Sequence, residues 1–377
     1  MRIFLFSLFF FFSCKSSSAI ETMAKQAIIY DVETNSVIYE KNADELMSPS
    51  SMSKLMTVYY VFKKLKNNEI SLNDKFSVSR KAWKKGGSKM FLNENSKVSI
   101  EDLLKGIIVQ SGNDACITIA EGFSGSEKNF AEELNILAKE IGLKNSNFVN
   151  ATGWPDIDHL MTARDVLNLS LRTINDFPQL YQMYSQKEFT YNKIKQLNRN
   201  PLLYTDSSAD GLKTGHTSLG GFGLAASSKR NNRRIILIIN GLDSSKERKK
   251  ESKRLMNSAF FEYKNLVITE NDQPFYSIKV WNGKNNKLKI NSKEKLGITI
   301  PKKIMNNIKI VLKYKSPLSA PIEKNDQVAK LLVKKVDGEI LKEFPLYASE
   351  DIKEKNFFSK LAFKFKYLIF GESIYSD

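Results

Sequence analysis

The sequence predicts an α+β protein in which a domain of strands, helices and strands is followed by a small all-β domain and a C-terminal amphipathic helix. Two pairs of β-branched and aromatic runs lie on either side of a long helical stretch. Short strands separated by Pro, Gly and Asn come next, and the last residues return to helical spacing.

The first predicted domain covers residues 24–264. Its first hairpin pairs 27–32 with 36–39, and Pro49 precedes a helix that we expect over 51–62. The remaining elements are a helical region over 101–172, strands that return near residue 210, a hairpin of 220–226 with 234–240, and a charged amphipathic helix over 247–263. Strands therefore begin and end this domain, and helices fill its middle.

The second predicted domain covers residues 265–347 and contains no recognisable catalytic motif. Its strands include 276–281, 308–314 and 328–333, and it lacks His and Cys. Residues 350–377 are predicted to form a basic amphipathic helix, because apolar side chains recur there at helical spacing between lysines. Such a helix lies in a membrane interface or packs on its own domain, and its terminal position favours the membrane.

The amino terminus has the pattern of a secretory signal peptide. A positive charge and an apolar run of about ten residues precede small residues that end at Ala19. We expect residues 1–19 to be removed and the protein to be exported. Cys14 leaves a lipoprotein route open, which would also export the protein. Cleavage after Ala19 would leave Cys116 alone, so we expect no intramolecular disulfide and a buried structural thiol.

The formal net charge of +17 suits nucleic acid, anionic lipid or another anionic polymer. The sequence has no Arg-rich stripe or stacking-aromatic motif of a nucleic-acid surface, so we expect no nucleic-acid partner. With only His159 and His216 present, neither a Ser-His-Asp triad nor a histidine-rich zinc site is well supported. We expect no cofactor and no metal ion.

A candidate nucleophile and base occur together in Ser51-Met-Ser-Lys54. On a helix, positions three residues apart project from one face, so the hydroxyl and the amine can form a hydrogen bond. A helix N-terminus also favours developing negative charge. Alone, the motif is weak, because a surface serine near a solvated lysine has the same spacing.

Two further motifs follow in order, Ser111-Gly-Asn113 after an apolar helix and Lys213-Thr-Gly215 just before a strand pair. Each tripeptide is by itself typical of a turn. The ordered set Ser-x-x-Lys, Ser-x-Asn and Lys-Thr-Gly is characteristic of β-lactamases and penicillin-binding proteins. Together the three motifs indicate a serine acyl-enzyme.

The chemistry assigns a role to each residue type. Lys54 can take the proton of Ser51 only when it is neutral, so its pKa must fall by about 3 from the usual value near 10.4. We expect burial and the second cation, Lys213, to lower it. Ser111 could relay the proton to the leaving amine, and Asn113 could hold Lys54 or the substrate backbone.

The substrate is expected to end in a free carboxylate. Lys213 and Thr214 would bind that carboxylate. Backbone N–H groups at Ser51 and His216 would hold the oxyanion of the tetrahedral intermediate.

Beyond these motifs, the sequence resembles the low-molecular-mass penicillin-binding D-Ala-D-Ala carboxypeptidases of the bacterial periplasm. The similar segments, in family order, are 51–57, 87–92, 110–116, 150–154, 162–165, 210–217 and 320–324. The resemblance implies the penicillin-binding/β-lactamase-like transpeptidase fold, which is an antiparallel sheet with flanking helices and a helical subdomain. It also implies an acyl-enzyme on Ser51. For the same chemistry it implies Lys54 as base, Ser111 and Asn113 as second-motif residues, and Lys213 as the carboxylate ligand.

The resemblance also implies partners and a location. The substrates would be peptidoglycan stem peptides ending in D-Ala-D-Ala, and β-lactams would inhibit covalently. Thr217, in the segment that contains Lys213, is a candidate for substrate binding with Thr214 and His216. The terminal helix would hold the protein on the outer face of the inner membrane, as family members use it. Arg248 resembles a family arginine that lies near the substrate. As a candidate site residue we rank it below the residues named above.

Three other functions are weighed against this one. A class A β-lactamase shares the motifs, but Ala131 stands where that class has a glutamate in its Glu-x-Glu-Leu-Asn pattern, and such enzymes lack the extra β domain. A non-catalytic peptidoglycan-binding protein would not need Ser51, Lys54 and Lys213 together. An endopeptidase acting on crosslinked muropeptides stays open.

Overall fold

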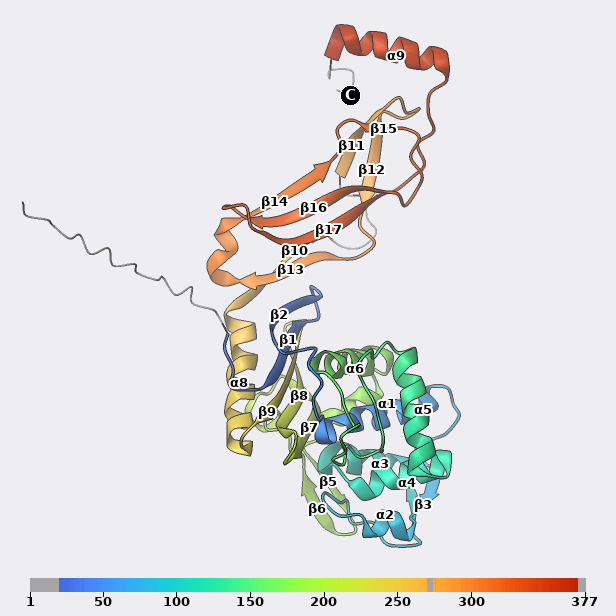
Figure 1. Cartoon of the computed structure of the whole chain (residues 1–377), viewed down its shortest axis with the longest axis vertical. Coiled ribbons are helices and arrows are strands. Elements are labelled where there is room, and N and C mark those ends of the chain that lie inside the picture. Colours follow the sequence, from blue (N-terminus) through green and yellow to red (C-terminus); the bar gives the residue numbers. More distant parts are fainter. Residues whose placement is uncertain (1–19, 270–273, 275, 372–377) are drawn as a thin grey trace, which may run out of the picture.

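A five-stranded antiparallel sheet organises the first part of the chain (Figure 1). Its strands, in spatial order, are β2 (Ser36–Lys41), β1 (Gln26–Asp31), β9 (Arg233–Leu242), β8 (Gly221–Arg230) and β7 (Ala209–Thr217). The side chains of β1 alternate between two separate cores, because Ile28 packs in one while Ala27 and Ile29 pack in the other. Both faces of the sheet are therefore covered.

Helices provide that cover. Figure 1 shows α1 (Lys54–Lys66) and α6 (Ala163–Asp176) on one side of the sheet and α8 (Ser245–Phe261) on the other. Side-chain caps fix where the last two begin, because Thr162 accepts a hydrogen bond from the N–H of Asp165 and Ser244 from that of Glu247. The computed structural model describes residues 20–269, 274 and 276–371, so the predicted signal peptide, residues 1–19, lies outside the described residues.

A helical subdomain packs beside α1. Its elements are β3 (Lys75–Ser77), α2 (Arg80–Lys84), β4 (Lys97–Ser99), α3 (Ile100–Lys105), the π-helix η2 (Gly106–Gln110), α4 (Asn113–Ser124) and α5 (Glu127–Glu140). The connection from α6 back to the sheet contains η3 (Leu180–Ser185), the hairpin of β5 (Glu188–Tyr191) and β6 (Ile194–Leu197), and α7 (Leu202–Thr205). The η1 turn (Ser50–Ser53) leads directly into α1.

Two expectations about this domain were wrong. Residues 141–162 are irregular rather than helical, because Gly142 and Gly153 adopt positive φ and Pro155 cannot continue a helix. The motif Lys213-Thr-Gly215 lies within β7, where it pairs with β8, rather than before the strand pair.

The second domain has its own core. β10 (Tyr263–Thr269) pairs with β13 (Leu296–Pro301). A six-stranded sheet has the order β14 (Ile308–Tyr314), β16 (Gln327–Lys335), β17 (Ile340–Ala348), β12 (Lys287–Asn291), β11 (Tyr276–Trp281) and β15 (Leu318–Ser319), and η4 (Lys302–Asn307) follows β13. The α+β fold with an added β domain is confirmed.

Buried polar contacts join the two domains. The hydroxyls of Thr34 and Thr299 are 2.6 Å apart. The amine of Lys342 donates to the carbonyls of Thr34 and Gly297 at 3.2 and 3.1 Å. The turn between β1 and β2 is thus fixed to the β domain.

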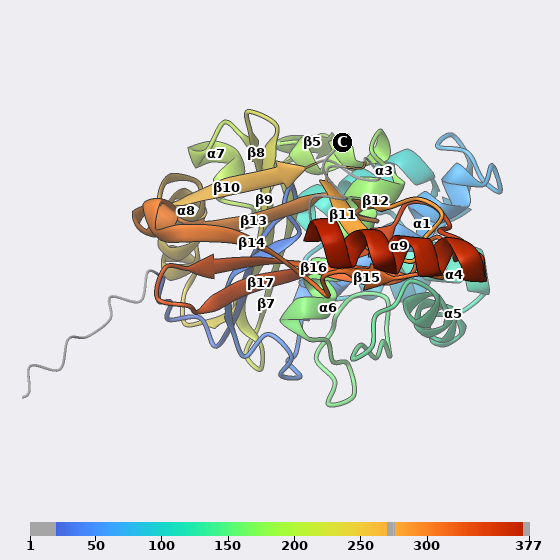
Figure 2. The ribbon, with the colours of Figure 1, turned by 90° about the horizontal axis from the view of Figure 1, so that it is seen from above.

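The helix α9 (Phe357–Phe370) lies at the end of the molecule farthest from α1, across the end of the β domain (Figures 1 and 2). Phe363 and Tyr367 pack their ring edges on Trp281. The exposed apolar side chains of α9 are Phe357, Phe358, Leu361, Phe365, Leu368, Ile369 and Phe370. Every helix among the described residues is too short or too polar to cross a membrane.

Candidate active site

Ser51 and Lys54 form the centre of the site. Ser51 lies in η1, and Lys54 is the first residue of α1. The amine of Lys54 donates to Oγ of Ser51 at 2.9 Å and to the carbonyl of Thr152. The lysine is fully buried, so its amine is held against the hydroxyl.

The surroundings of Lys54 favour its neutral form. Burial is the main cause and lowers the pKa of Lys54 to about 8. Cys116 acts in the opposite direction, whereas the positive charges of Arg199 and Lys85 lower this pKa further. Lys213 is also buried, and burial together with the charge of Lys54 lowers the pKa of Lys213 well below its usual value. The amine of Lys54 is therefore a usable base near neutral pH.

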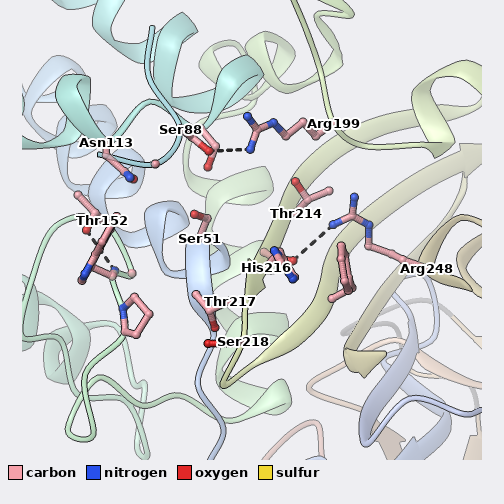
Figure 3. Close-up of a pocket in the computed structure, with 17 residues that line it drawn as sticks. Ser51, Ser88, Asn113, Thr152, Arg199, Thr214, His216, Thr217, Ser218 and Arg248 are labelled. Atoms are coloured by element: carbon pink, nitrogen blue, oxygen red, sulfur yellow. Dashed lines mark hydrogen bonds between the residues drawn. The ribbon is translucent and has the colours of Figure 1, made fainter. Parts of the chain in front are cut away.

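The edge strand β7 forms one wall. Gly215 is needed there, because a Cβ at this position would lie 2.7 Å from the carbonyl oxygen of Pro49. This close approach brings Thr214, His216 and Thr217 to the cavity (Figure 3). Lys213 is buried behind them and donates to the carbonyl of Thr214 at 3.3 Å.

The second motif lies opposite β7. Ser111 follows the π-helix with a left-handed φ of 66°, a conformation that costs energy for a residue with a side chain and is typical of functional sites. Its buried Oγ has no hydrogen-bond partner among the described residues. The amide of Asn113 donates to the carbonyl of Gly86 at 2.9 Å, so in this structure it holds the chain near Gly86 rather than Lys54.

The loop 150–154 supplies the carbonyl that holds Lys54. Oδ1 of Asn150 accepts hydrogen bonds from the N–H groups of Thr152 and Trp154, both at 3.0 Å. Gly153 has a φ of 70°, and a Cβ there would lie 2.0 Å from the carbonyl oxygen of Ser50. The loop can reach the nucleophile only with glycine at this position.

These elements enclose a cavity of about 530 Å³. Its lining residues are Ser51, Gly87, Ser88, Ser111, Asn113, Thr152, Gly153, Trp154, Pro155, Arg199, Thr214, Gly215, His216, Thr217, Ser218, Phe222 and Arg248. The lining includes two arginines and no aspartate or glutamate. The cavity therefore suits an anionic ligand.

The structure brings the predicted residues together around this cavity. Ser51, Ser111, Asn113, Thr214, His216 and Thr217 line it, and Lys54 and Lys213 are buried in its walls. Arg248, which was the lowest-ranked candidate site residue from the sequence, also lines the cavity. Its guanidinium donates to the carbonyls of Gly215 and Gly223, both at 3.4 Å.

Sequence reasoning missed Ser88, Thr152, Trp154 and Arg199. The first three lie in segments that resemble the family, so a signal was available. Arg199 lies in a different segment, between β6 and α7, and donates to Oγ of Ser88 at 2.6 Å.

Cys116 and His159 lie away from the cavity lining. The thiol of Cys116 is buried, and burial raises its pKa to about 12, so it is a poor nucleophile. Nδ1 of His159 accepts a hydrogen bond from the N–H of Val149 at 3.3 Å. Burial lowers the pKa of His159 to about 4, which is consistent with a structural role for a neutral ring.

Comparison with known proteins identifies the family to which this site belongs. A family model described as D-alanyl-D-alanine carboxypeptidase matches residues 13–244. The chain belongs to this D-alanyl-D-alanine carboxypeptidase family. A second model, described as the C-terminal domain of penicillin-binding protein 5, matches residues 261–354. The chain is therefore a serine-type peptidase, as the sequence predicted.

Several D-alanyl-D-alanine carboxypeptidases are similar over most of the chain. DacC of Escherichia coli strain K12 is 34% identical over 95% of this chain and 92% of its own length. Penicillin-binding protein 5 from Haemophilus influenzae superposes with a TM-score of 0.81 at 34% identity, over 89% of this chain and 99% of that one. Penicillin-binding protein D2 from Listeria monocytogenes, solved in an ampicillin-bound form, is 30% identical, with a TM-score of 0.59 over 64% of this chain and 98% of that one.

Proposed function

We propose that this enzyme removes the terminal D-Ala from peptidoglycan stem peptides that end in D-Ala-D-Ala, through an acyl-enzyme on Ser51. The observation that supports this most directly is the hydrogen bond from buried Lys54 to Ser51, beside a cavity lined by two arginines and no acids. A peptide with a C-terminal carboxylate fits that charge.

Acylation uses the groups around Ser51. Neutral Lys54 takes the proton of Ser51 as Oγ attacks the carbonyl carbon of the penultimate D-Ala. The backbone N–H groups of Ser51 and His216 hold the oxyanion of the tetrahedral intermediate. As this intermediate collapses, the C–N bond breaks, and the leaving D-Ala amine receives the proton from Lys54 through Ser111.

Substrate positioning uses β7 and α8. Thr214 and Arg248 line the cavity and bind the terminal carboxylate, with the Lys213 amine buried behind Thr214, and Thr217 lines the same wall. After D-Ala leaves, water attacks the ester on Ser51, and Lys54 accepts the proton of that water. As the ester C–O bond breaks, Lys54 gives this proton to Oγ of Ser51, which regenerates the hydroxyl and releases the shortened peptide.

β-Lactams are expected to acylate the same serine. Their amide lies in a strained ring and carries a nearby carboxylate, so it can occupy the place of the D-Ala-D-Ala bond. The relative that was solved with ampicillin supports this proposal.

The test is release of D-Ala from a synthetic pentapeptide, together with labelling by fluorescent penicillin. We expect both for the full chain and neither for Ser51→Ala. An adduct that survives in Ser51→Ala would contradict the mechanism. A wild-type enzyme that ignores the pentapeptide but cleaves crosslinked muropeptides would instead be an endopeptidase.

We further propose that the protein is exported to the periplasm and associates through α9 with the outer face of the inner membrane. The signal-peptide pattern of residues 1–19 supports export. Exposed aromatic and aliphatic side chains along α9, with lysines between them, support a helix that lies in the membrane interface.

A further inference from the structure

The outer side of α8 carries four exposed lysines at helical spacing, Lys246, Lys249, Lys250 and Lys253. Residues i, i+3, i+4 and i+7 of a helix share one face, so the four amines form a single row, which we call the lysine stripe. The opposite side of α8 packs on the sheet through buried residues such as Leu255. The stripe therefore points to solvent.

Neither acid of α8 forms an ion pair with this row, although the charge of Lys250 helps to lower the pKa of Glu251. Glu247 accepts a hydrogen bond from the N–H of Asp243 at 2.8 Å, where it helps to begin the helix. Glu251 is buried and pairs with Arg254 at 2.8 Å and with Thr22 at 3.0 Å. In the part of the chain that the structure describes, none of the four stripe lysines forms an ion pair.

The lysine stripe does not help α8 to fold. Its members form like-charge pairs three and four residues apart, and such pairs destabilise a helix. Lys246 also lies in the first turn, where the helix dipole disfavours positive charge. A role in helix stability therefore does not explain the stripe.

The position of α8 indicates what the stripe could bind. Arg248 projects from the same helix into the catalytic cavity. It lies on the side of α8 away from the stripe, so the stripe is about one helix diameter, or about 10 Å, from the cavity wall. Figure 1 shows α9 at one end of the long axis, with the β domain between it and α8. A membrane bound to α9 would therefore lie far from the stripe, which argues against a lipid partner.

We propose that the lysine stripe binds the carboxylates of neighbouring stem peptides on the same peptidoglycan strand, while the reacting peptide occupies the cavity. This proposal rests on the proposed function. The stripe extends about 10 Å along the helix axis, which leaves room for more than one carboxylate. Its charge complements such an acidic polymer, and a strand that passes around α8 can reach both the stripe and the cavity. The enzyme should therefore favour polymeric peptidoglycan over free peptide.

The test compares the full chain with a variant in which all four lysines become glutamine, K246Q/K249Q/K250Q/K253Q. Binding to purified peptidoglycan sacculi is measured by co-sedimentation in detergent at about 0.05 M and 0.5 M salt. We expect the variant to bind about tenfold more weakly at low salt and to lose most of the salt dependence. Release of D-Ala from a free pentapeptide should not change.

A matched control removes four exposed lysines of the β domain, K302Q/K309Q/K313Q/K315Q. This control should bind sacculi like the wild type. Equal loss in both variants would show that net charge, not the stripe, matters, and would overturn the proposal. Unchanged binding of the stripe variant, or undiminished binding to sacculi whose carboxylates have been amidated, would also overturn it. Failure of the wild type on the pentapeptide would instead contradict the proposed function, because sacculus binding is measured separately.

Discussion

At Gly153 the main chain passes directly against the residue before the nucleophile. The positive φ and the missing Cβ allow the loop 150–154 to lie against Ser50. The carbonyl of Thr152 then reaches the amine of Lys54. The position of the Lys54 amine thus depends on a residue that contributes no side chain.

Replacing Gly153 with alanine should therefore impair both folding and turnover. The new methyl would overlap the carbonyl oxygen of Ser50, and we expect a loss of at least about 2 kcal/mol of stability and at least about tenfold of kcat. Thermal unfolding and D-Ala release measure the two effects. Gly125→Ala is the matched control, because Gly125 has a similar φ of 72° with open space around it. Equal effects at both sites would contradict the steric explanation.

The pH dependence of catalysis should report the protonation of Lys54. Its pKa is lowered to about 8, and only the neutral amine can accept the proton of Ser51. The value of kcat/KM should therefore rise with pH and level off above about pH 8. Removing the nearby positive charge in Arg199→Gln should raise this pKa and move the rising limb to higher pH by a few tenths. A limb that stays in place or moves to lower pH would contradict this assignment.

The candidate site was only partly predictable from sequence. Ser51 and Lys54 are close in sequence, and helical geometry alone brings their side chains together. The acceptor at Thr152 is a main-chain carbonyl, which any residue type provides, so no sequence pattern marks it. Arg199 reaches the cavity only because the β5–β6 hairpin folds back on the segment that contains Ser88.

Among the elements, the hairpins were the most predictable and the long loop the least. Runs of apolar residues mark β1, β8 and β9, because these strands are buried on both faces. Residues 141–162 contain apolar side chains at helical spacing. In the structure, however, side chains outside this loop accept hydrogen bonds from its backbone N–H groups. Asp165 accepts from the N–H of Asn145 at 2.7 Å, and Asn135 from that of Phe148 at 2.8 Å. Such distant partners are not visible in a local pattern.

The exposed face of α9 gives a prediction about membranes. Substituting serine for both Phe358 and Leu368 removes two of its most exposed apolar side chains. Partition into anionic lipid vesicles should fall about tenfold or more, and pentapeptide turnover should stay unchanged. Vesicle sedimentation measures this directly. Val336→Ser with Ile340→Ser is the control on the β domain, and an equal fall in both pairs would contradict a specific role for α9.

At the scale of the whole molecule, the catalytic and β domains have separate cores that are joined by a few polar contacts. Lys342→Met should leave the carbonyls of Thr34 and Gly297 without their donor. We expect a loss of about 1–3 kcal/mol from the stability of the β domain, with no change in pentapeptide turnover. Urea unfolding monitored at Trp281 measures it.

Lys330→Met is the matched control for that substitution. Lys330 pairs with Glu343 on the surface, at 3.1 Å, where an ion pair contributes at most about 1 kcal/mol. If Lys330→Met destabilises the β domain as much as Lys342→Met does, the contact between the domains contributes no more to stability than a surface ion pair.

The connection between the domains has a mechanical consequence. The helix α8 ends at Phe261, and β10 begins at Tyr263, so a single residue separates them. At the other end of α8, about 20 Å away, Arg248 forms part of the cavity wall. Because α8 is continuous between these two points, we expect a rotation of the β domain about the helix axis to be passed on to Arg248 in the cavity wall.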